Sequence, residues 1–312
     1  MKILVTGSSG FLGTHLCDHL EYSGHTVSKA NSKNCDLTDP KSLNVYGSNC
    51  YDQIVHLAAW TQAGEFCLHH PGEQWIINQQ INTNILAWWR TFQPQAKFIC
   101  MGTSCAYSLD LPLSEGNYLK GQPINSLFTY AMTKRMLYAG LLAMNQQFGL
   151  EFLCLVPSTL YGTGYHTDGR QMHFIFDLIR KILRGKIYNE PVVLWGTGYQ
   201  TRELVYVEDF IEAMLQVDKV AKNDLINLGA GEEFSIRYFA KIICNYVDYD
   251  FENILFDTGR YVGANSKCLD ISKFRNICPS FEYTPVLIGI HRTIDWFILN
   301  KEKLLSAESI NP

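Results

Sequence analysis

The sequence begins, after Met1, with Lys2-Ile3-Leu4-Val5-Thr6-Gly7-Ser8-Ser9-Gly10-Phe11-Leu12-Gly13. The apolar run before Gly7 is typical of a strand that is buried on both faces of a parallel sheet. Helical patterning follows Gly13 as far as about Ser23, and Gly24 is the expected end of that helix. The segment therefore predicts a strand, a glycine-rich turn and a helix, in that order.

Gly7, Gly10 and Gly13 stand where the expected strand meets the expected helix. Without a Cβ, their backbone N–H groups can approach a pyrophosphate at the positive end of the helix. The alternative is a glycine turn with a purely structural role. Because the turn follows the first strand of a longer βα series, we favour a dinucleotide site.

The alternation of strands and helices continues along the chain. Strands are expected at His25–Lys29, Gln53–Ala59, Lys97–Thr103 and Glu151–Pro157, and helices at Gln74–Phe92 and Ser126–Phe148. Parallel strands need crossover connections, so repeated βα units predict a Rossmann-type, doubly wound parallel sheet. The fold class is α/β.

The pattern changes after Pro157. A loop opens at Tyr161-Gly162-Thr163-Gly164, a helix is expected at Gln171–Arg184, and a strand at Val192–Trp195. We expect residues 1–160 to form the dinucleotide-binding domain, with residues 200–230 returning to it. Residues 161–199 and 231–312 would then form a smaller α/β substrate domain.

The composition excludes several classes of function. The chain has 312 residues, with 26 Lys and Arg against 30 Asp and Glu, so its formal net charge is −4. It has no cationic excess to hold nucleic acid or anionic lipid, and no apolar run reaches the ~18 residues of a membrane span. Its ten cysteines contain no CxxC pair, which disfavours zinc and disulfides. We expect a cytoplasmic protein that binds no metal, membrane or nucleic acid.

The residues after the expected second strand bear on the choice of cofactor. Sites for NAD place an acid there to bind the ribose hydroxyls, but this chain has Lys29-Ala30-Asn31-Ser32-Lys33. No carboxylate would repel a 2′-phosphate and two lysines stand close by, so we expect NADP(H) rather than NAD(H).

Tyr130 and Lys134 lie four residues apart on an expected helix, which puts both side chains on one face. The pair follows Met101-Gly102-Thr103-Ser104-Cys105-Ala106-Tyr107, at the carboxyl end of an expected strand. Open α/β sheets place their sites at such strand ends. A nearby ammonium lowers the pKa of a phenol from its reference near ~10, so we expect Lys134 to act on Tyr130 in this way.

These motifs resemble the extended short-chain dehydrogenase/reductase family, also called the NAD-dependent epimerase/dehydratase family. The resemblance covers nearly the whole chain and, within the family, is strongest to the GDP-L-fucose synthases. Those enzymes epimerise a GDP-4-keto-6-deoxy sugar at C3 and C5 and reduce C4 with NADPH. The motifs are the glycine turn, His56-Leu57-Ala58-Ala59, Asn84, Thr103 to Tyr107, Tyr130 with Lys134, Pro157 to Gly162 and Arg202 to Asp209.

The resemblance implies a role for each of five residues. Tyr130 would protonate O4 during hydride transfer, Lys134 would hold the nicotinamide ribose, and Thr103 would hydrogen-bond the same oxygen. Cys105 would be the epimerisation base and His173 the acid. If the strand continues, its period puts Cys105 on the same side as Thr103. The thiol needs activation, for which Lys134 or the nicotinamide charge is a candidate. The alternative is a buried thiol and a histidine that only binds.

The remaining site residues follow from the motif positions and the resemblance. Arg202 is the best candidate for a diphosphate clamp because its guanidinium offers a planar fork of donors, and Lys267 is a weaker candidate for the same role. Trp195 and His173 are further substrate-binding candidates. The expected cofactor-binding residues are Gly7, Ser9, Gly10, Phe11, Leu12, Asn31, Lys33, Asp36, Leu37, Leu57, Ala58, Ala59, Tyr130, Lys134, Pro157, Thr159 and Leu160.

Two positions depart from the fucose synthase pattern. Ser9 replaces an arginine of the phosphate turn, and Thr159 replaces an asparagine before Leu-Tyr-Gly. A 4-reductase without epimerisation therefore stays open, as does an NAD-dependent nucleotide-sugar 4-epimerase or dehydratase. A protein that senses a dinucleotide without turnover is the alternative of another class. A homodimer through the two long helices fits the family.

Overall fold

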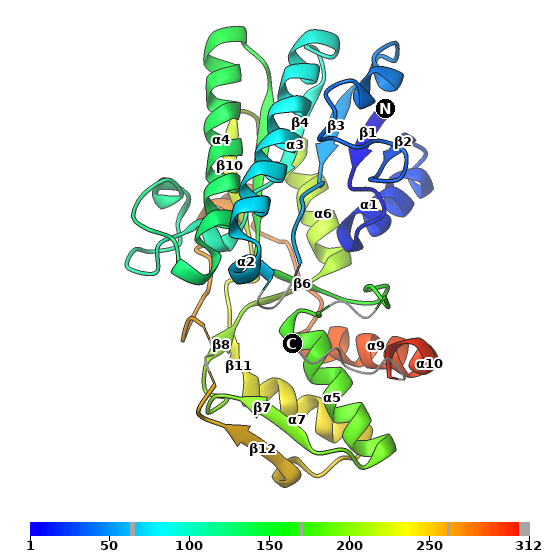
Figure 1. The fold of residues 1–312 in the computed structure, drawn as a ribbon, viewed down its shortest axis with the longest axis vertical. Helices are drawn as coiled ribbons and strands as arrows, with labels where there is room; N and C mark the ends of the chain where they lie inside the picture. The colour runs from blue at the N-terminus through cyan, green and yellow to red at the C-terminus, as the bar shows by residue number, and fades with distance from the viewer. Residues whose placement is uncertain (63–65, 169–170, 261–262, 306–312) are drawn as a thin grey trace.

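The computed structural model describes residues 1–62, 66–168, 171–260 and 263–305 (Figure 1). The expected substrate domain therefore includes residues outside the described ones, 306–312 among them. No helix in the described ranges has the length and apolar character needed to cross a membrane. All ten cysteines are free thiols, and the described residues contain no cluster of three or more His, Cys, Asp or Glu side chains suited to a metal.

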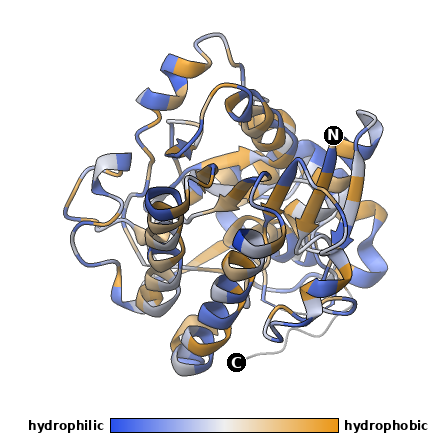
Figure 2. Ribbon diagram, turned by 90° about the horizontal axis from the view of Figure 1, so that it is seen from above, coloured by the Kyte–Doolittle hydropathy of each residue, from blue (hydrophilic) through white to orange (hydrophobic). Residues whose placement is uncertain are grey.

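A six-stranded parallel sheet forms the centre of the N-terminal part, as predicted. Its strand order is β10-β5-β4-β3-β1-β2. The strands are β1 (Lys2–Thr6), β2 (Thr26–Ala30), β3 (Gln53–His56), β4 (Lys97–Met101), β5 (Phe152–Pro157) and β10 (Asp224–Leu228). Figure 2 shows apolar strands in the middle of the molecule with helices around them. Burial on both faces explains why these strands read as apolar runs.

The direction of winding reverses at β1, which lies between β2 and β3. Right-handed crossovers that run in opposite directions put their helices on opposite faces of a sheet. Accordingly α3 (Pro71–Phe92) packs beside α4 (Phe128–Phe148), while α1 (Phe11–Tyr22) lies against α6 (Val207–Asp218) beyond the strands (Figure 1). In folds of this type, the crevice outside the carboxyl ends of β1 and β3 is where ligands bind.

A second hydrophobic cluster lies in the lower part of Figure 1. It is built by α5 (Phe174–Tyr188), α7 (Ile236–Val247), α9 (Val286–Leu299), α10 (Lys301–Leu304) and the parallel pair β7 (Val192–Trp195) and β12 (Ile254–Asp257). Three further short segments are α2 (Phe66–His69), α8 (Ser272–Ile277) and the 3₁₀ turn η2 (Ser104–Ala106). The domain boundaries given above stay a prediction.

Two small strand pairs join the lower part to the central sheet region. β6 (Thr159–Tyr161) runs parallel to β9 (Leu204–Tyr206), and β8 (Thr201–Arg202) runs antiparallel to β11 (Phe234–Ser235). The strand expected at Lys97–Thr103 ends two residues early, at Met101, because the chain turns into η2. That difference changes how the site is built.

Candidate active site

The glycine turn is closed tightly against the end of β3. Gly7 has φ of +68°, and a Cβ there would lie 2.7 Å from the Ala58 nitrogen; a Cβ on Gly13 would lie 2.2 Å from the Gly7 carbonyl oxygen. The helix α1 starts directly after the turn, with Gly10 as its N-cap residue. This close approach of bare backbone at a helix N-terminus fits the pyrophosphate of a dinucleotide.

The loop after β2 is held by its own amide groups. The backbone N–H of Asn31 donates to Asn34 Oδ1 (2.8 Å), and that of Lys33 donates to Asn31 Oδ1 (2.9 Å). Asn84 Nδ2 donates to the Leu37 carbonyl at 2.9 Å. Lys29 is ion-paired with Glu21 of α1 at 2.9 Å. Lys33, which is exposed, is therefore the better candidate for a 2′-phosphate.

The other residues predicted to contact a dinucleotide lie around the turn. Ser9 is exposed, and Leu37 has a buried side chain. Leu57, Ala58 and Ala59 follow the carboxyl end of β3, Pro157 ends β5, and Thr159 and Leu160 belong to β6. Their contacts with a cofactor stay predictions.

Lys134 is buried deep in the site region. Its amine donates to the Met101 carbonyl at 2.9 Å, at the end of β4, and only 5% of the residue is exposed. Burial lowers the pKa of Lys134, while the nearby thiols of Cys100 and Cys154 oppose this. His56 behaves similarly: burial lowers its pKa to about 3, and Lys134 adds to the effect.

The expected lowering of the Tyr130 pKa is wrong. Burial raises this pKa, the nearby Cys105 and Cys67 thiols raise it further, and a hydrogen bond with Thr103 only partly opposes them. Lys134 does not offset this rise, because its ammonium donates to the Met101 carbonyl instead. The phenol is therefore protonated at neutral pH, which is the state that a proton donor needs.

Thr103 and Cys105 do not lie on a continuing strand, so the expected strand period does not apply to them. Thr103 instead caps η2, because its Oγ1 accepts from the Cys105 backbone N–H at 3.3 Å. The Thr103 backbone N–H donates to the buried Tyr118 hydroxyl at 3.2 Å. The turn still brings the Thr103 hydroxyl into hydrogen-bond contact with Tyr130.

The Cys105 thiol contacts a lysine that is 162 residues away in the chain: Lys267 Nζ lies 3.1 Å from Cys105 Sγ. Burial works to raise the pKa of Cys105, but the charge and hydrogen bond of Lys267, the Thr103 hydrogen bond and the charge of Arg202 outweigh it and lower that pKa. Lys134, one of the two candidates for this activation, instead donates to the Met101 carbonyl.

Arg202 lies close enough to affect Cys105 and is itself anchored. Its Nη1 donates to the carbonyls of Thr201 (2.6 Å) and Ala264 (2.8 Å), and burial lowers its pKa. Trp195, at the end of β7, is 41% exposed and has Arg260 at 5.3 Å and Lys181 at 5.7 Å from its ring. Its ring is accessible for stacking, but these contacts do not join it to Cys105.

His173 is the residue immediately before α5. Its backbone N–H donates to the Tyr165 hydroxyl at 3.4 Å. The side chain keeps contact with solvent, yet the surrounding protein and then the charges of Lys267 and His166 lower its pKa to about 4. A neutral imidazole is therefore expected near pH 7, whereas the expected role as an acid needs a proton to give.

Two functional supports were missed from sequence. Glu203, buried, accepts from the backbone N–H groups of Gly231 (2.7 Å) and Leu269 (3.0 Å), and burial raises its pKa to about 7. Asn227, also buried, accepts from the Tyr107 hydroxyl at 2.6 Å. Glu203 follows Arg202 in the Arg202–Asp209 motif, but the local sequence does not show which backbone groups it binds. The same holds for the hydrogen-bond partners of Asn227.

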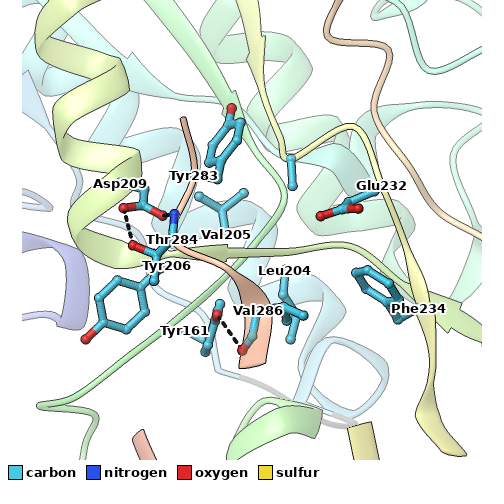
Figure 3. A pocket seen from close by; sticks show the side chains of 11 residues that line it. Tyr161, Leu204, Val205, Tyr206, Asp209, Glu232, Phe234, Tyr283, Thr284 and Val286 are labelled. Atoms are coloured by element: carbon cyan, nitrogen blue, oxygen red, sulfur yellow. Dashed lines mark hydrogen bonds between the residues drawn. The ribbon is translucent and has the colours of Figure 1, made fainter. Parts of the chain in front are cut away.

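A small cavity lies apart from the predicted catalytic residues, beside β9 and the start of α9 (Figure 3). Asp209 faces Thr284 there and accepts from its backbone N–H (2.7 Å) and hydroxyl (2.8 Å). The Tyr161 hydroxyl faces the Val286 carbonyl at 3.5 Å. These bonds join α6 and β6 to the segment that begins α9. We assign the cavity no chemistry.

Comparison with known proteins places this architecture in a family. The model of the NAD dependent epimerase/dehydratase family matches residues 3–229. The chain is 27% identical to a GDP-L-fucose synthase of Dictyostelium discoideum, with 96% of each chain covered. It is 26% identical to a dTDP-4-dehydro-6-deoxy-D-allose reductase of Streptomyces sp, over 96% of this chain and 97% of the relative.

The fold agrees with solved structures of similar proteins. A GDP-L-fucose synthetase from Naegleria fowleri, solved with bound NADP, superposes with a TM-score of 0.85 at 25% identity, covering 97% of this chain and 96% of that one. The family's enzymes use NAD(P) and act on nucleotide sugars. Because the family model matches most of its length, the chain belongs to the NAD-dependent epimerase/dehydratase family, within the extended short-chain dehydrogenases/reductases.

Proposed function

We propose that the protein is an NADPH-dependent epimerase/reductase that acts on a nucleotide 4-keto-6-deoxy sugar, with GDP as the favoured nucleotide. One observation carries the proposal. The Thr103 hydroxyl contacts both the Tyr130 phenol and the backbone of Cys105. Cys105 is also close enough to Tyr130 to raise the pKa of the phenol, which supports a proton donor for O4 and a thiol base that serve one substrate.

The reduction needs a proton donor at O4. When bound, the cofactor supplies hydride to the C4 carbonyl carbon. Tyr130, held protonated by its raised pKa, gives its proton to O4 as negative charge develops there. The Thr103 hydroxyl donates a hydrogen bond to the same oxygen. Lys134, at the β4 end, is placed to hold the ribose beside the phenol.

The epimerisation needs a base at C3 and C5, where hydrogens are acidified by the C4 carbonyl. Cys105 with a lowered pKa can take such a proton at neutral pH. The electrons of the broken C–H bond move into an enolate, whose oxygen lies with Tyr130 and Thr103. A proton returned to the opposite face completes the inversion. We assign that step to His173, which must first take up a proton from solvent because its resting imidazole is neutral.

Incubation with NADPH and GDP-4-keto-6-deoxymannose in D2O tests both parts. We expect loss of NADPH absorbance at 340 nm, and deuterium at C3 and C5 of the product by NMR. Cys105→Ser should abolish the deuterium and leave C4 reduction in place, whereas Cys50→Ser, at an exposed position, changes neither. No NADPH consumption with any nucleotide 4-keto sugar would contradict the reductase assignment.

A 4-reductase without epimerisation is the second candidate. It is favoured by the lowered pKa of His173, which leaves the expected acid without its proton near neutrality. The name of the Streptomyces relative, a reductase, fits this activity. The two candidates separate in the same D2O experiment, because a pure reductase adds no solvent deuterium at C3 or C5 and is indifferent to Cys105→Ser.

The preference for NADP(H) rests on the loop after β2. Asn31, Ser32 and Lys33, which directly follow Ala30, include no carboxylate, and Lys33 is exposed there. Comparing the Kd of NADPH with that of NADH by fluorescence titration tests the preference. Lys33→Met should weaken NADPH binding and leave NADH binding unchanged, whereas equal losses for both would contradict a contact with the 2′-phosphate.

We also propose a homodimer through α3 and α4. Leu137 and Leu141 are buried within the protomer, but Trp75, Met136 and Leu142 are 41%, 45% and 39% exposed on these two helices. The two helices pack beside each other, and exposed apolar side chains on such a pair suit a two-fold helical interface. Light scattering after gel filtration gives the mass, and Met136→Glu should reduce it to that of one chain.

A further inference from the structure

We propose that Lys267 is a positioning residue that favours the thiolate form of Cys105, because its ammonium stands against the sulfur. We further propose that the hydrogen bonds around Lys267 hold the chain in place for this contact. The proposal rests on the function proposed above and deepens it. It replaces the prediction that Lys267 binds the substrate diphosphate.

The contact is direct and charged. Lys267 Nζ lies 3.1 Å from Cys105 Sγ, a distance at which an ammonium hydrogen points at the sulfur. The thiol is only partly accessible, so water screens this pair less than it would an exposed one. An ammonium stabilises the thiolate over the thiol, which shifts the proton equilibrium toward the base form.

The other groups that act on Cys105 do not replace Lys267. Arg202 lowers the pKa of Cys105 through its positive charge, and that effect is smaller than those of Lys267 and Thr103; Thr103 contributes a neutral hydroxyl. Tyr130 and the Cys67 thiol also face this region, and their raised pKa values keep both neutral near pH 7. Lys267 is thus the charged group in hydrogen-bond contact with the sulfur.

The chain that carries Lys267 is irregular, but it is held at nearly every residue. Neither a helix nor a strand covers residues 263–270, so backbone order there depends on tethers from other elements. Arg202 donates to the Ala264 carbonyl (2.8 Å), and the Thr201 N–H donates to the Asn265 carbonyl (2.8 Å). The Glu233 carboxylate accepts from the Ser266 hydroxyl (2.6 Å) and the Lys267 N–H (3.0 Å). The Glu203 carboxylate accepts from the Leu269 N–H (3.0 Å).

One buried residue connects both sides of the pair. Asn227 donates to the Asp270 carbonyl at 2.9 Å, three residues after Lys267, and accepts from Tyr107, two residues after Cys105. A lysine side chain loses much rotamer freedom when it is fixed. Hydrogen bonds on both flanks reduce the conformational freedom that the backbone around Lys267 would otherwise lose on substrate binding. The ammonium is therefore already in place before substrate binds.

The proton balance is simple. Cys105 in the thiolate form takes the proton from the carbon next to the C4 carbonyl, and a new S–H bond replaces the C–H bond. The electron pair goes to the enolate. Lys267 keeps all its protons throughout. It only sets the fraction of Cys105 that is in the thiolate form and can act as a base.

The test measures the thiol in the resting protein and needs no substrate. Alkylation of Cys105 by iodoacetamide is followed by peptide mass spectrometry from pH 5 to pH 10, with exposed Cys50 as the internal reference. In Lys267→Met we expect the midpoint to rise by about one pH unit and the rate at pH 7 to fall about tenfold. Lys267→Arg keeps the charge and should retain most of the rate.

Lys222→Met is the matched control, because that lysine is 69% exposed and makes only a loose ion pair at 3.9 Å with Glu151. It should leave the Cys105 profile unchanged, and thermal unfolding of each variant shows whether it is folded. An unchanged profile in folded Lys267→Met, together with a raised KM for the nucleotide sugar, would overturn the proposal in favour of diphosphate binding. Absence of turnover on every nucleotide sugar would defeat the proposed function alone, since the alkylation result stands by itself.

Discussion

The two halves of the candidate site are held in different ways. Tyr130 and Lys134 stand one turn apart on a 21-residue helix, and the Lys134 amine reaches the end of an adjacent strand. Cys105 and Lys267 come from a three-residue turn and an irregular segment, 162 residues apart. The first pair is placed by regular secondary structure, the second by hydrogen bonds between side chains and backbone.

This difference indicates how each half responds to change. A helix packed on a parallel sheet places its side chains to within a narrow range, because many backbone bonds cooperate. A tethered loop depends on a few buried polar residues, and losing one partner leaves others unsatisfied. We therefore expect the reduction half to tolerate remote substitutions that damage the thiol half.

The largest expected effect is at the phenol. Tyr130→Phe removes the proton donor to O4 and should lower kcat for NADPH oxidation by about 10²- to 10⁴-fold, the range for lost general acid catalysis. The KM for NADPH should change little. Tyr138→Phe, two turns along the same helix, is the control and should keep near full activity. Equal losses in both variants would contradict a specific role for Tyr130.

The next effect tests the dependence of the thiol half on remote tethers. Asn227→Ala removes the partner of the Tyr107 hydroxyl, the donor to the Asp270 carbonyl and one of two donors to the Leu113 carbonyl, which also accepts from the Asp270 N–H. These losses should lower the free energy of unfolding by about 3 kcal/mol. Asn145→Ala removes one half-buried bond to Leu150 and should cost about 1 kcal/mol. Urea denaturation measures the free energy of unfolding of both variants. Similar losses in the two would contradict the role of Asn227 as the residue that links the two flanks of the Cys105–Lys267 pair.

A smaller effect concerns the cofactor crevice that serves the reduction half. Gly7→Ala forces a side chain onto backbone at φ of +68° and against the Ala58 nitrogen. We expect NADPH binding to weaken at least about tenfold. Gly24→Ala has the same strain, at φ of +79°, with nothing within 4 Å, so it should lower the melting temperature while the Kd stays the same. If Gly24→Ala weakened NADPH equally, strain rather than contact would explain the loss.

The smallest effect separates the two halves by the pH dependence of stability. Burial lowers the folded pKa of His56 from 6.5 to about 3, so between those values the unfolded chain binds the extra proton and stability falls as pH falls. Burial raises the folded pKa of Glu203 from 4.5 to about 7, so between those values the folded chain binds the extra proton and stability rises as pH falls.

The two slopes oppose each other between pH 7 and pH 5, each by at most about 1.4 kcal/mol per pH unit. His56→Asn should therefore lose less stability on acidification than the unchanged protein, and Glu203→Gln should lose more. Chemical denaturation at pH 7, 6 and 5 gives the three curves. Identical curves would show that neither group titrates in this window.

Much of the fold follows from sequence, and the reason is physical. Strands buried on both faces must be apolar throughout, and glycine must stand where Gly7 meets Ala58, so β1, the turn and α1 were predictable from residues 2–24. The family followed from the same motifs. The end of β4 was not predictable, because Thr103 can extend a strand or cap a turn with equal ease, and packing against Tyr118 selects the turn.

The electrostatics of the site could not be predicted from sequence. Spacing suggested that Lys134 would act on Tyr130 and Cys105, but its amine bonds the Met101 carbonyl, and the lysine at the thiol is Lys267. Glu203 and Asn227 carry no recognisable local pattern. Their role depends on which distant backbone groups reach them.

The sequence by itself determined the βα order, the glycine turn and the pairing of Tyr130 with Lys134, because strand and helix periodicity act over a few residues. Only the tertiary structure decided which charged side chain contacts the Cys105 thiol. It also decided the direction in which the pKa values of Tyr130, His173 and Glu203 shift. Those outcomes depend on burial and on distances of a few ångströms between residues far apart in the chain, and such distances exist only once the chain has folded.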